Sequence, residues 1–160
     1  ARTGEGSGSG PPWIGMGTVT SAARAREALD AGTEFVVTPN TKPPVAQLVR
    51  DAGVFLVAGA LTPTEIVEAW DAGADLVKVF PLPPVGGPVY LSVVRGPLGD
   101  IPMLASGGFD VEEIPAYRDA GAVAFGIGAP LLGLTVEETG ARIRRALELA
   151  RGTAAPEASA

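Results

Sequence analysis

The chain has 160 residues, a formal net charge of −6 and 46% hydrophobic residues. This length builds one domain, and the apolar composition favours a folded core over disorder. There is no cysteine, which excludes disulfide scaffolds and thiol catalysis, and no histidine, which excludes Ser-His-Asp chemistry and imidazole ligands. The acidic balance, with ten scattered arginines, argues against a nucleic-acid surface.

We expect both ends of the chain to lie outside the folded domain. Residues 1–12 are a flexible lead-in rich in Gly, Ser and Pro, and residues 152–160 are a disordered tail of small residues, which leaves 13–151 for the domain. The least charged long stretch, 120–134, is shorter than the roughly 18 residues that span a bilayer. With no recognisable signal peptide, these features predict a soluble, cytoplasmic protein that binds neither membrane nor nucleic acid.

Short apolar runs alternate with helical segments along the chain. The tripeptide Asp-Ala-Gly precedes an apolar run four times, at 30–32, 51–53, 71–73 and 119–121. A glycine there ends a helix in the left-handed conformation, and a continuous apolar run is typical of a parallel strand covered on both faces. The pattern predicts six strands, at 13–17, 35–38, 54–58, 76–80, 101–105 and 123–127.

A helix is expected after each strand. The segments 62–65 and 110–113 begin with a capping residue followed by acids, and the last helix is expected over 136–151. Six strand–helix units indicate an α/β fold. They form either six of the eight units of a TIM-type β/α barrel, which takes about 200 residues or more, or an open α/β sheet.

Lysine occurs only twice, and one of the two interrupts a predicted strand. Lys42 lies beside two prolines in a polar turn, and we interpret it as a solvated surface residue. Lys78 lies in the apolar run 76–80, on the strand face opposite Val77 and Val79. If the valines face the helices, Lys78 points into the barrel, where desolvation lowers the pKa of its amine and leaves it able to attack a ketone. The alternative is a core lysine that pairs with a carboxylate or extends to the rim.

Hydroxyls and glycines follow the predicted strands and would share one rim with that lysine. Thr18, Thr38 and Ser106 could each bind a carboxylate or hydroxyl of a small substrate, or cap the backbone. The turns 106–108 and 126–128 carry glycines that let backbone N–H groups approach an anion, or serve as plain tight turns. Schiff-base chemistry also needs a proton shuttle, and none of the six strands ends in an acidic residue.

Five short motifs follow one another with a regular spacing. They are Gly-x-Gly-Thr-Val at 15–19, Thr-Pro at 38–39, Lys-x-Phe-Pro at 78–81, Ser-Gly-Gly at 106–108 and a last Gly-x-Gly at 126–128. Together they resemble the 2-keto-3-deoxy-6-phosphogluconate / 4-hydroxy-2-oxoglutarate aldolase family. The resemblance covers about residues 13–133.

The resemblance implies a class I aldolase on an eight-unit barrel, without metal or other cofactor and commonly a homotrimer. Lys78 resembles the Schiff-base lysine, which would attack the C2 ketone of a 2-keto-3-deoxy sugar acid phosphate or of 4-hydroxy-2-oxoglutarate. Pyruvate and an aldehyde would follow, as in Entner–Doudoroff carbohydrate metabolism. Ser106 takes the place of a threonine that contacts pyruvate. The other implied substrate-binding residues are Thr18, Pro39, Phe80, Gly107, Gly108 and Gly128.

The sequence departs from the family pattern in three places. Ala129 stands where a serine usually lies near the phosphate, and Asn40 replaces a glycine after Thr-Pro. The family's first two strand–helix units are absent, and with them its catalytic glutamate and a carboxylate-binding arginine, so we expect an N-terminally truncated aldolase. Two further interpretations stay open. One is a non-catalytic, truncated or degenerate protein of aldolase fold; the other is a different barrel enzyme, such as an isomerase or a thiamine-phosphate-type synthase, acting on a phosphorylated substrate.

Overall fold

The computed structural model describes residues 11–133 and 135–152, so most of the predicted lead-in and tail lies outside the described residues. Six parallel strands form one sheet in which each strand pairs with the next along the chain. They are β1 (Gly15–Met16), β2 (Phe35–Val37), β3 (Phe55–Ala60), β4 (Leu76–Val79), β5 (Met103–Ser106) and β6 (Ala124–Gly126). All six predicted strands are confirmed, with ends that differ from the expected ones by at most two residues.

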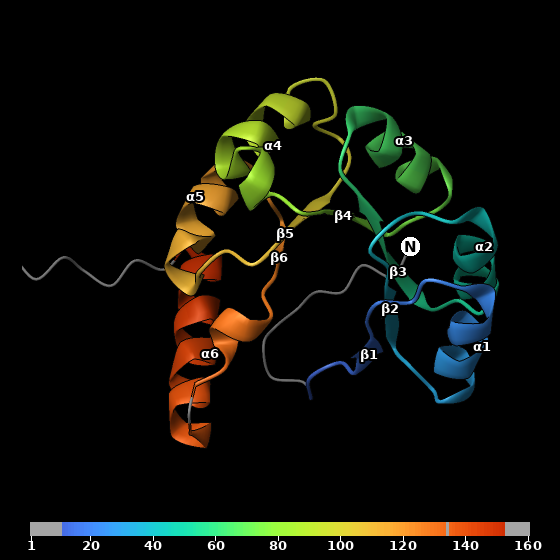
Figure 1. Ribbon diagram of the computed structural model, residues 1–160, viewed down its shortest axis with the longest axis horizontal. Helices are drawn as coiled ribbons and strands as arrows, with labels where there is room; N and C mark the ends of the chain where they lie inside the picture. The colour runs from blue at the N-terminus through green and yellow to red at the C-terminus, as the bar shows by residue number, and fades with distance from the viewer. Residues whose placement is uncertain (1–10, 134, 153–160) are drawn as a thin grey trace, which may run out of the picture.

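A helix follows each strand, as the sequence predicts. The helices are α1 (Ala22–Asp30), α2 (Pro43–Asp51), α3 (Pro63–Asp71), α4 (Gly87–Arg95), α5 (Ile114–Asp119) and α6 (Val136–Arg151). Short 3-10 turns lie at η1 (Pro83–Val85), η2 (Val111–Glu113) and η3 (Ala129–Leu131). Figure 1 shows the helices as an arc around the outside of the sheet, with α1 and α6 at its two ends. The described residues therefore form an α/β half-barrel of six units, in which β1 and β6 each have one strand neighbour.

The Asp-Ala-Gly repeat ends four helices in the same way. Asp30 is the last residue of α1, and Gly32 takes a φ of +78°. The N–H of Gly32 donates to the carbonyl of Leu29 at 3.0 Å, and that of Thr33 to the carbonyl of Ala28 at 3.2 Å. This pair of bonds is the Schellman motif, whose left-handed residue is glycine because a Cβ would be strained there. The same pair recurs around glycines 53, 73 and 121.

The predicted helix starts at 62 and 110 are both capping boxes. At the start of α3 the hydroxyl of Thr62 accepts a hydrogen bond from the N–H of Glu65, whose carboxylate accepts from the N–H groups of Leu61 and Thr62, both at 2.9 Å. These backbone donors stabilise the ionised carboxylate and lower the pKa of Glu65.

The two faces of the sheet differ in burial. The face toward the helices carries fully buried side chains that belong to one core cluster with helix residues, among them Val36, Leu56, Val77, Val79 and Met103. On the opposite face Val57 is 4% exposed, but most side chains are only partly buried, among them Phe35, Leu76, Lys78, Leu104 and Ala124. One core thus lies between sheet and helices, and no second layer of described residues covers the inner face (Figure 1).

Helix α6 packs less completely than the others. Ala146, Leu149 and Ala150 contact the core cluster, but none of the helix residues is fully buried. A second stripe, formed by Val136, Ile143 and Leu147 at spacings of seven and four residues, is 83%, 43% and 47% exposed. None of the described helices is long and apolar enough to cross a membrane.

Candidate active site

Lys78 lies on β4 and faces away from the helices, as predicted. Its neighbours Val77 and Val79 are 0% exposed in the core, and strand alternation turns Lys78 to the inner face. The side chain is half-buried there rather than fully buried, because the described residues do not cover that face. Its Nζ lies 4.5 Å from the centroid of the Phe80 ring. Desolvation lowers the pKa of the Lys78 amine.

The ion pairs within 11–133 and 135–152 do not involve Lys78. This observation goes against the interpretation of Lys78 as a core lysine paired with a carboxylate. The acids at the starts of β2 and β4 lie at the opposite rim, as expected. Glu34 accepts a hydrogen bond from the N–H of Ile14 at 2.6 Å, and Asp75 accepts one from the N–H of Leu56 at 2.8 Å. Both carboxylates therefore link neighbouring segments at the amino ends of the strands. The candidate site lies at the opposite, carboxyl ends.

Gly59 brings the loop after β2 against the neighbourhood of Lys78. It pairs in register with Lys78, and a Cβ on it would lie 2.2 Å from the carbonyl carbon of Pro39. The hydroxyl of Thr38 accepts a hydrogen bond from the N–H of Gly59 at 3.1 Å, and that of Thr41 donates to its carbonyl at 3.0 Å. Our sequence analysis missed this glycine, although a lone glycine inside a strand signals a close approach of another backbone.

The ends of β4, β5 and β6 are joined to one another. The N–H of Leu82 donates to the carbonyl of Ser106 at 3.0 Å, and the Ser106 hydroxyl donates to the carbonyl of Gly126 at 3.0 Å. Gly107 has a φ of +142°, and a Cβ there would lie 2.8 Å from the nitrogen of Leu82. Only glycine fits this position, so the turn after β5 lies directly against the segment that follows Phe80.

Contacts and strand register link five of the predicted site residues, and the other three lie at the same rim without such a contact among those given above. Pro39, Lys78, Phe80, Ser106 and Gly107 are linked by the strand register and the contacts above. Thr18 and Gly128 follow the two edge strands, and Gly108 is exposed, with open space where a Cβ would lie. All eight lie within or just after the carboxyl ends of the strands, which is the face that carries active sites in β/α barrels.

Two of the three candidate hydroxyls bond to the backbone. Thr38 and Ser106 are 3% and 7% exposed, and both oxygens make the backbone hydrogen bonds described above. Of the two roles expected for these hydroxyls, binding a substrate or capping the backbone, Thr38 and Ser106 therefore show the second. Thr18 differs, because it is exposed and its backbone has a φ of +57°.

In the part of the chain that the structure describes, there is no group of three Asp or Glu residues that could hold a metal ion.

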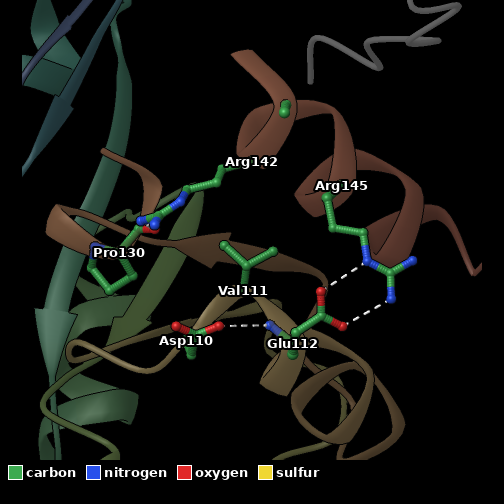
Figure 2. A pocket seen from close by; sticks show the side chains of 7 residues that line it. Asp110, Val111, Glu112, Pro130, Arg142 and Arg145 are labelled. Atoms are coloured by element: carbon green, nitrogen blue, oxygen red, sulfur yellow. Dashed lines mark hydrogen bonds and ion pairs between the residues drawn. The ribbon is translucent and has the colours of Figure 1, made fainter. Parts of the chain in front are cut away.

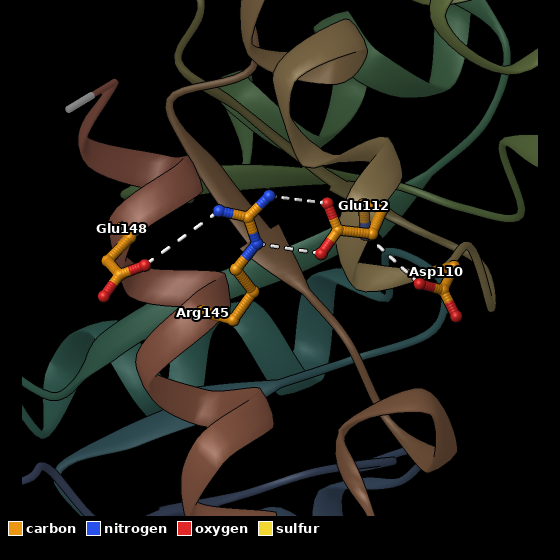
Figure 3. A network of polar contacts seen from close by, with 4 residues as sticks. All are labelled: Asp110, Glu112, Arg145 and Glu148. Carbon is orange, nitrogen blue, oxygen red and sulfur yellow. Dashed lines mark hydrogen bonds and ion pairs between the residues drawn. The ribbon is translucent and has the colours of Figure 1, made fainter. Parts of the chain in front are cut away.

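A cavity of about 380 Å³ lies away from Lys78, between α6 and the loops after β5 and β6. Figure 2 shows its lining: Asp110, Val111, Glu112, Pro130, Ala141, Arg142 and Arg145. The guanidinium of Arg145 donates two hydrogen bonds to Glu112, at 2.9 and 2.8 Å, and lies 4.0 Å from Glu148 (Figure 3). This pairing lowers the pKa of Glu112 and raises that of Arg145. Arg142 donates to the carbonyls of Pro130 and Leu132. These charged groups hold α6 against the half-barrel.

Comparison with known proteins agrees with this arrangement. Residues 11–145 match the model of the family described as KDPG and KHG aldolase. The chain is 36% identical over 119 residues to a probable 2-dehydro-3-deoxy-6-phosphogalactonate aldolase of Rhizobium meliloti. The matched stretch covers 74% of this chain and 56% of the relative. A solved native KDPGal structure is 31% identical with a TM-score of 0.82, over 88% of this chain and 69% of that one. A crystal structure of a 4-hydroxy-2-oxoglutarate/2-dehydro-3-deoxyphosphogluconate aldolase is 35% identical with a TM-score of 0.78, over 85% and 68%.

The chain spans about half the length of the curated relatives that it matches. Its six strand–helix units superpose on the corresponding part of the longer aldolase structures. The match of the family model to most of the chain, together with this fold, shows that the chain belongs to the KDPG/KHG aldolase family.

Proposed function

We propose that this chain forms six of the eight units of a class I aldolase that cleaves a 2-keto-3-deoxy sugar acid phosphate or 4-hydroxy-2-oxoglutarate to pyruvate and an aldehyde. The observation that carries the proposal is Lys78. Its amine is half-buried on the inner face, has a lowered pKa and lies over the Phe80 ring instead of in an ion pair. An uncharged amine in this position is a nucleophile for a ketone.

The proposed chemistry needs no electron acceptor beyond the Schiff base. The Lys78 nitrogen attacks C2 of the keto acid, the carbonyl oxygen takes up protons and leaves as water, and an iminium forms. The C4 hydroxyl then gives up its proton, the C3–C4 bond breaks, and its electron pair moves into the iminium to give an enamine and an aldehyde. Protonation of the enamine at C3 and addition of water release pyruvate and restore the amine.

The proton shuttle is the part of this chemistry that the described residues do not supply beside Lys78. The family resemblance assigns that role to a glutamate in the family's first two strand–helix units. We propose that these two units complete the barrel between β6 and β1. Among the described residues, β1 and β6 each have one side without a strand neighbour, and the stripe of Val136, Ile143 and Leu147 on α6 is exposed and could receive a further helix.

The finer assignments rest on the residues at the rim. Thr18, Pro39 and Phe80 would line the pyruvate pocket, and Ser106 would contact the pyruvate once its hydroxyl releases the carbonyl of Gly126. The backbone N–H groups of Gly107, Gly108 and Gly128 would hold the phosphate of a phosphorylated substrate, although Ala129 offers no hydroxyl to it. A homotrimer, which the resemblance implies, completes this proposal, and we place it in the cytoplasm without a membrane or nucleic-acid partner.

Trapping with pyruvate and borohydride tests the proposal. We would treat two proteins: the 160-residue chain, and the same chain preceded by the first two strand–helix units of the Rhizobium meliloti relative. Reduction of the imine should add a 1-carboxyethyl group to the Lys78 nitrogen, and Lys78→Met should remove this label. Lys42 is the internal control, since it is the only other lysine. A label on Lys42, or no label on either protein, would contradict the assignment.

A second candidate is a non-catalytic protein of aldolase fold. It is favoured because none of the six described strands ends in an acidic residue that could act as the proton shuttle. It predicts that the extended protein releases no pyruvate from either aldol substrate, even at high protein concentration. Imine trapping without pyruvate release would support this candidate, and release from either substrate would eliminate it. A barrel enzyme with other phosphate chemistry gains no support, because the family match is to aldolases.

A further inference from the structure

Thr18 has an unusual backbone conformation for its residue type. Its φ of +57° makes it the one non-glycine residue with positive φ among those that the structure describes. A β-branched residue is strongly disfavoured there and keeps the conformation only where its surroundings enforce it. The loop from Gly17 to Ser21 must therefore be held by contacts outside itself.

Three contacts hold this loop. Val19 is 1% exposed in the core, and its N–H donates to the carbonyl of Val37 at 3.2 Å. The guanidinium of Arg24 donates to the carbonyl of Thr18 at 3.2 Å, and the Lys42 Nζ donates to the carbonyl of Thr20 at 3.0 Å. The loop is thus fixed from the core by Val19 and from α1 and the start of α2 by two cations.

Both cations occupy positions that helix stability disfavours. Arg24 is the third residue of α1, and Lys42 is the N-cap of α2, where its side chain makes no capping hydrogen bond. The first turn of a helix favours acids and capping side chains, because it carries a partial positive charge. Neither first turn contains an acid. In contrast, α3 and α6 begin with capping boxes and glutamates. The requirements of the two helices therefore do not explain Arg24 and Lys42.

We propose that Arg24 and Lys42 are positioning residues that clamp the loop 17–21 and hold Thr18 in its left-handed conformation at the carboxyl end of β1. Arg24 and Lys42 would affect catalysis only through Thr18. The catalytic part of this inference therefore rests on the proposed function. Neither residue takes part in the ion pairs within the described ranges, which leaves their donors for the loop carbonyls. Our sequence-based interpretation of Lys42 as a plain surface residue is thereby extended: it is exposed, but it links the loops after β1 and β2.

Hydrogen exchange tests the clamp without reference to catalysis. In the double variant Arg24→Met/Lys42→Met, the Val19 amide should exchange about tenfold faster, because the strained loop opens more often. Adding Thr18→Gly should restore much of the protection, since glycine adopts a positive φ without strain. Arg26→Met is the matched control on the same helix, and it should leave the exchange unchanged. An unchanged Val19 amide in the double variant would overturn the proposal.

Pyruvate trapping on the extended protein tests the catalytic part. The double variant should need about tenfold more pyruvate for half-maximal trapping at Lys78, with a saturated rate within about twofold of the parent. Arg24→Gln/Lys42→Gln keeps hydrogen-bond donors without charge, and should recover most of the loss if the clamp works by positioning. Parent-like trapping by the Met variant would refute this part. If no protein traps pyruvate while the exchange result holds, the clamp stands and the proposed function fails.

Discussion

Gly59 of β3 pairs in register with Lys78 of β4, and the absence of a side chain on Gly59 is what lets the backbone of Pro39 approach this position. The half-barrel therefore places a loop from the second unit beside an amine from the fourth. The same relationship explains why the hydroxyls of Thr38 and Thr41 both bond to the Gly59 backbone. A single strand glycine thus decides how closely the candidate site is packed.

Gly59→Ala should destabilise the chain by about 1–3 kcal/mol, because its Cβ would lie 2.2 Å from the Pro39 carbonyl carbon and backbone must move to make room. Denaturant unfolding followed by circular dichroism measures the change. Gly17→Ala is the control, since there is open space where its Cβ would lie. Equal stabilities for the two variants would show that the close approach carries no energetic weight.

Lys78→Met should stabilise the folded chain at pH 7. Burial lowers the folded-state pKa of Lys78 below its ordinary value of 10.5, so the folded state binds fewer protons than the unfolded state between the two values. The free energy of unfolding of the parent therefore rises as the pH climbs through this window. The difference in stability between the Met variant and the parent becomes smaller toward pH 10.5 and above. Thermal melts at a series of pH values measure this. A Lys78→Met variant that is less stable than the parent at pH 7 would contradict the desolvation argument.

Glu65→Ala should cost about 1 kcal/mol at pH 7, because two backbone N–H groups at the start of α3 lose their acceptor. The folded-state pKa of Glu65 lies below its ordinary value of 4.5, so the stabilisation is present above that pH and is lost as the pH falls through the folded value. Urea titrations at pH 7 and pH 3 should show a smaller difference between parent and variant at the lower pH. Glu68→Ala, on the same helix, is the comparison.

Breaking the Glu112–Arg145 pair should loosen α6 from the half-barrel, since this bidentate contact joins the helix to the start of η2. Glu112→Gln should speed hydrogen exchange in α6, and the effect should be smaller in 1 M salt, where exposed charges are screened. The charge swap Glu112→Arg/Arg145→Glu should slow the exchange again. If the swap behaves no better than the single variant, the pair does not hold the helix.

The order of the elements could be predicted from the sequence because local signals repeat. Each Asp-Ala-Gly ends a helix through the same two backbone bonds, and this chemistry is contained in a few consecutive residues. The face of Lys78 also followed from alternation, since Val77 and Val79 are apolar and β4 lies inside the sheet. These signals do not depend on what packs against the strand.

Features that depend on contacts between distant segments could not be predicted. The half-burial of Lys78 reflects an inner face that the described residues leave uncovered, although its strand reads as a buried run. Thr38 and Ser106 look like ligand-binding hydroxyls until the carbonyl or N–H of the neighbouring strand is in place. The pairing of Arg145 with Glu112 joins residues 33 positions apart, and no local pattern in the sequence indicates it.

Because strands that follow one another along the chain are paired, the β-pairings of the sheet join residues 19 to 26 positions apart. Pairing between neighbouring units allows each unit to dock on the one already formed, in the direction in which a ribosome releases the chain. Folding of this kind resembles growth of a solenoid, where each module needs only its predecessor. Gene fusion or fission at a boundary between modules would therefore leave the remaining modules with their nearest neighbours intact.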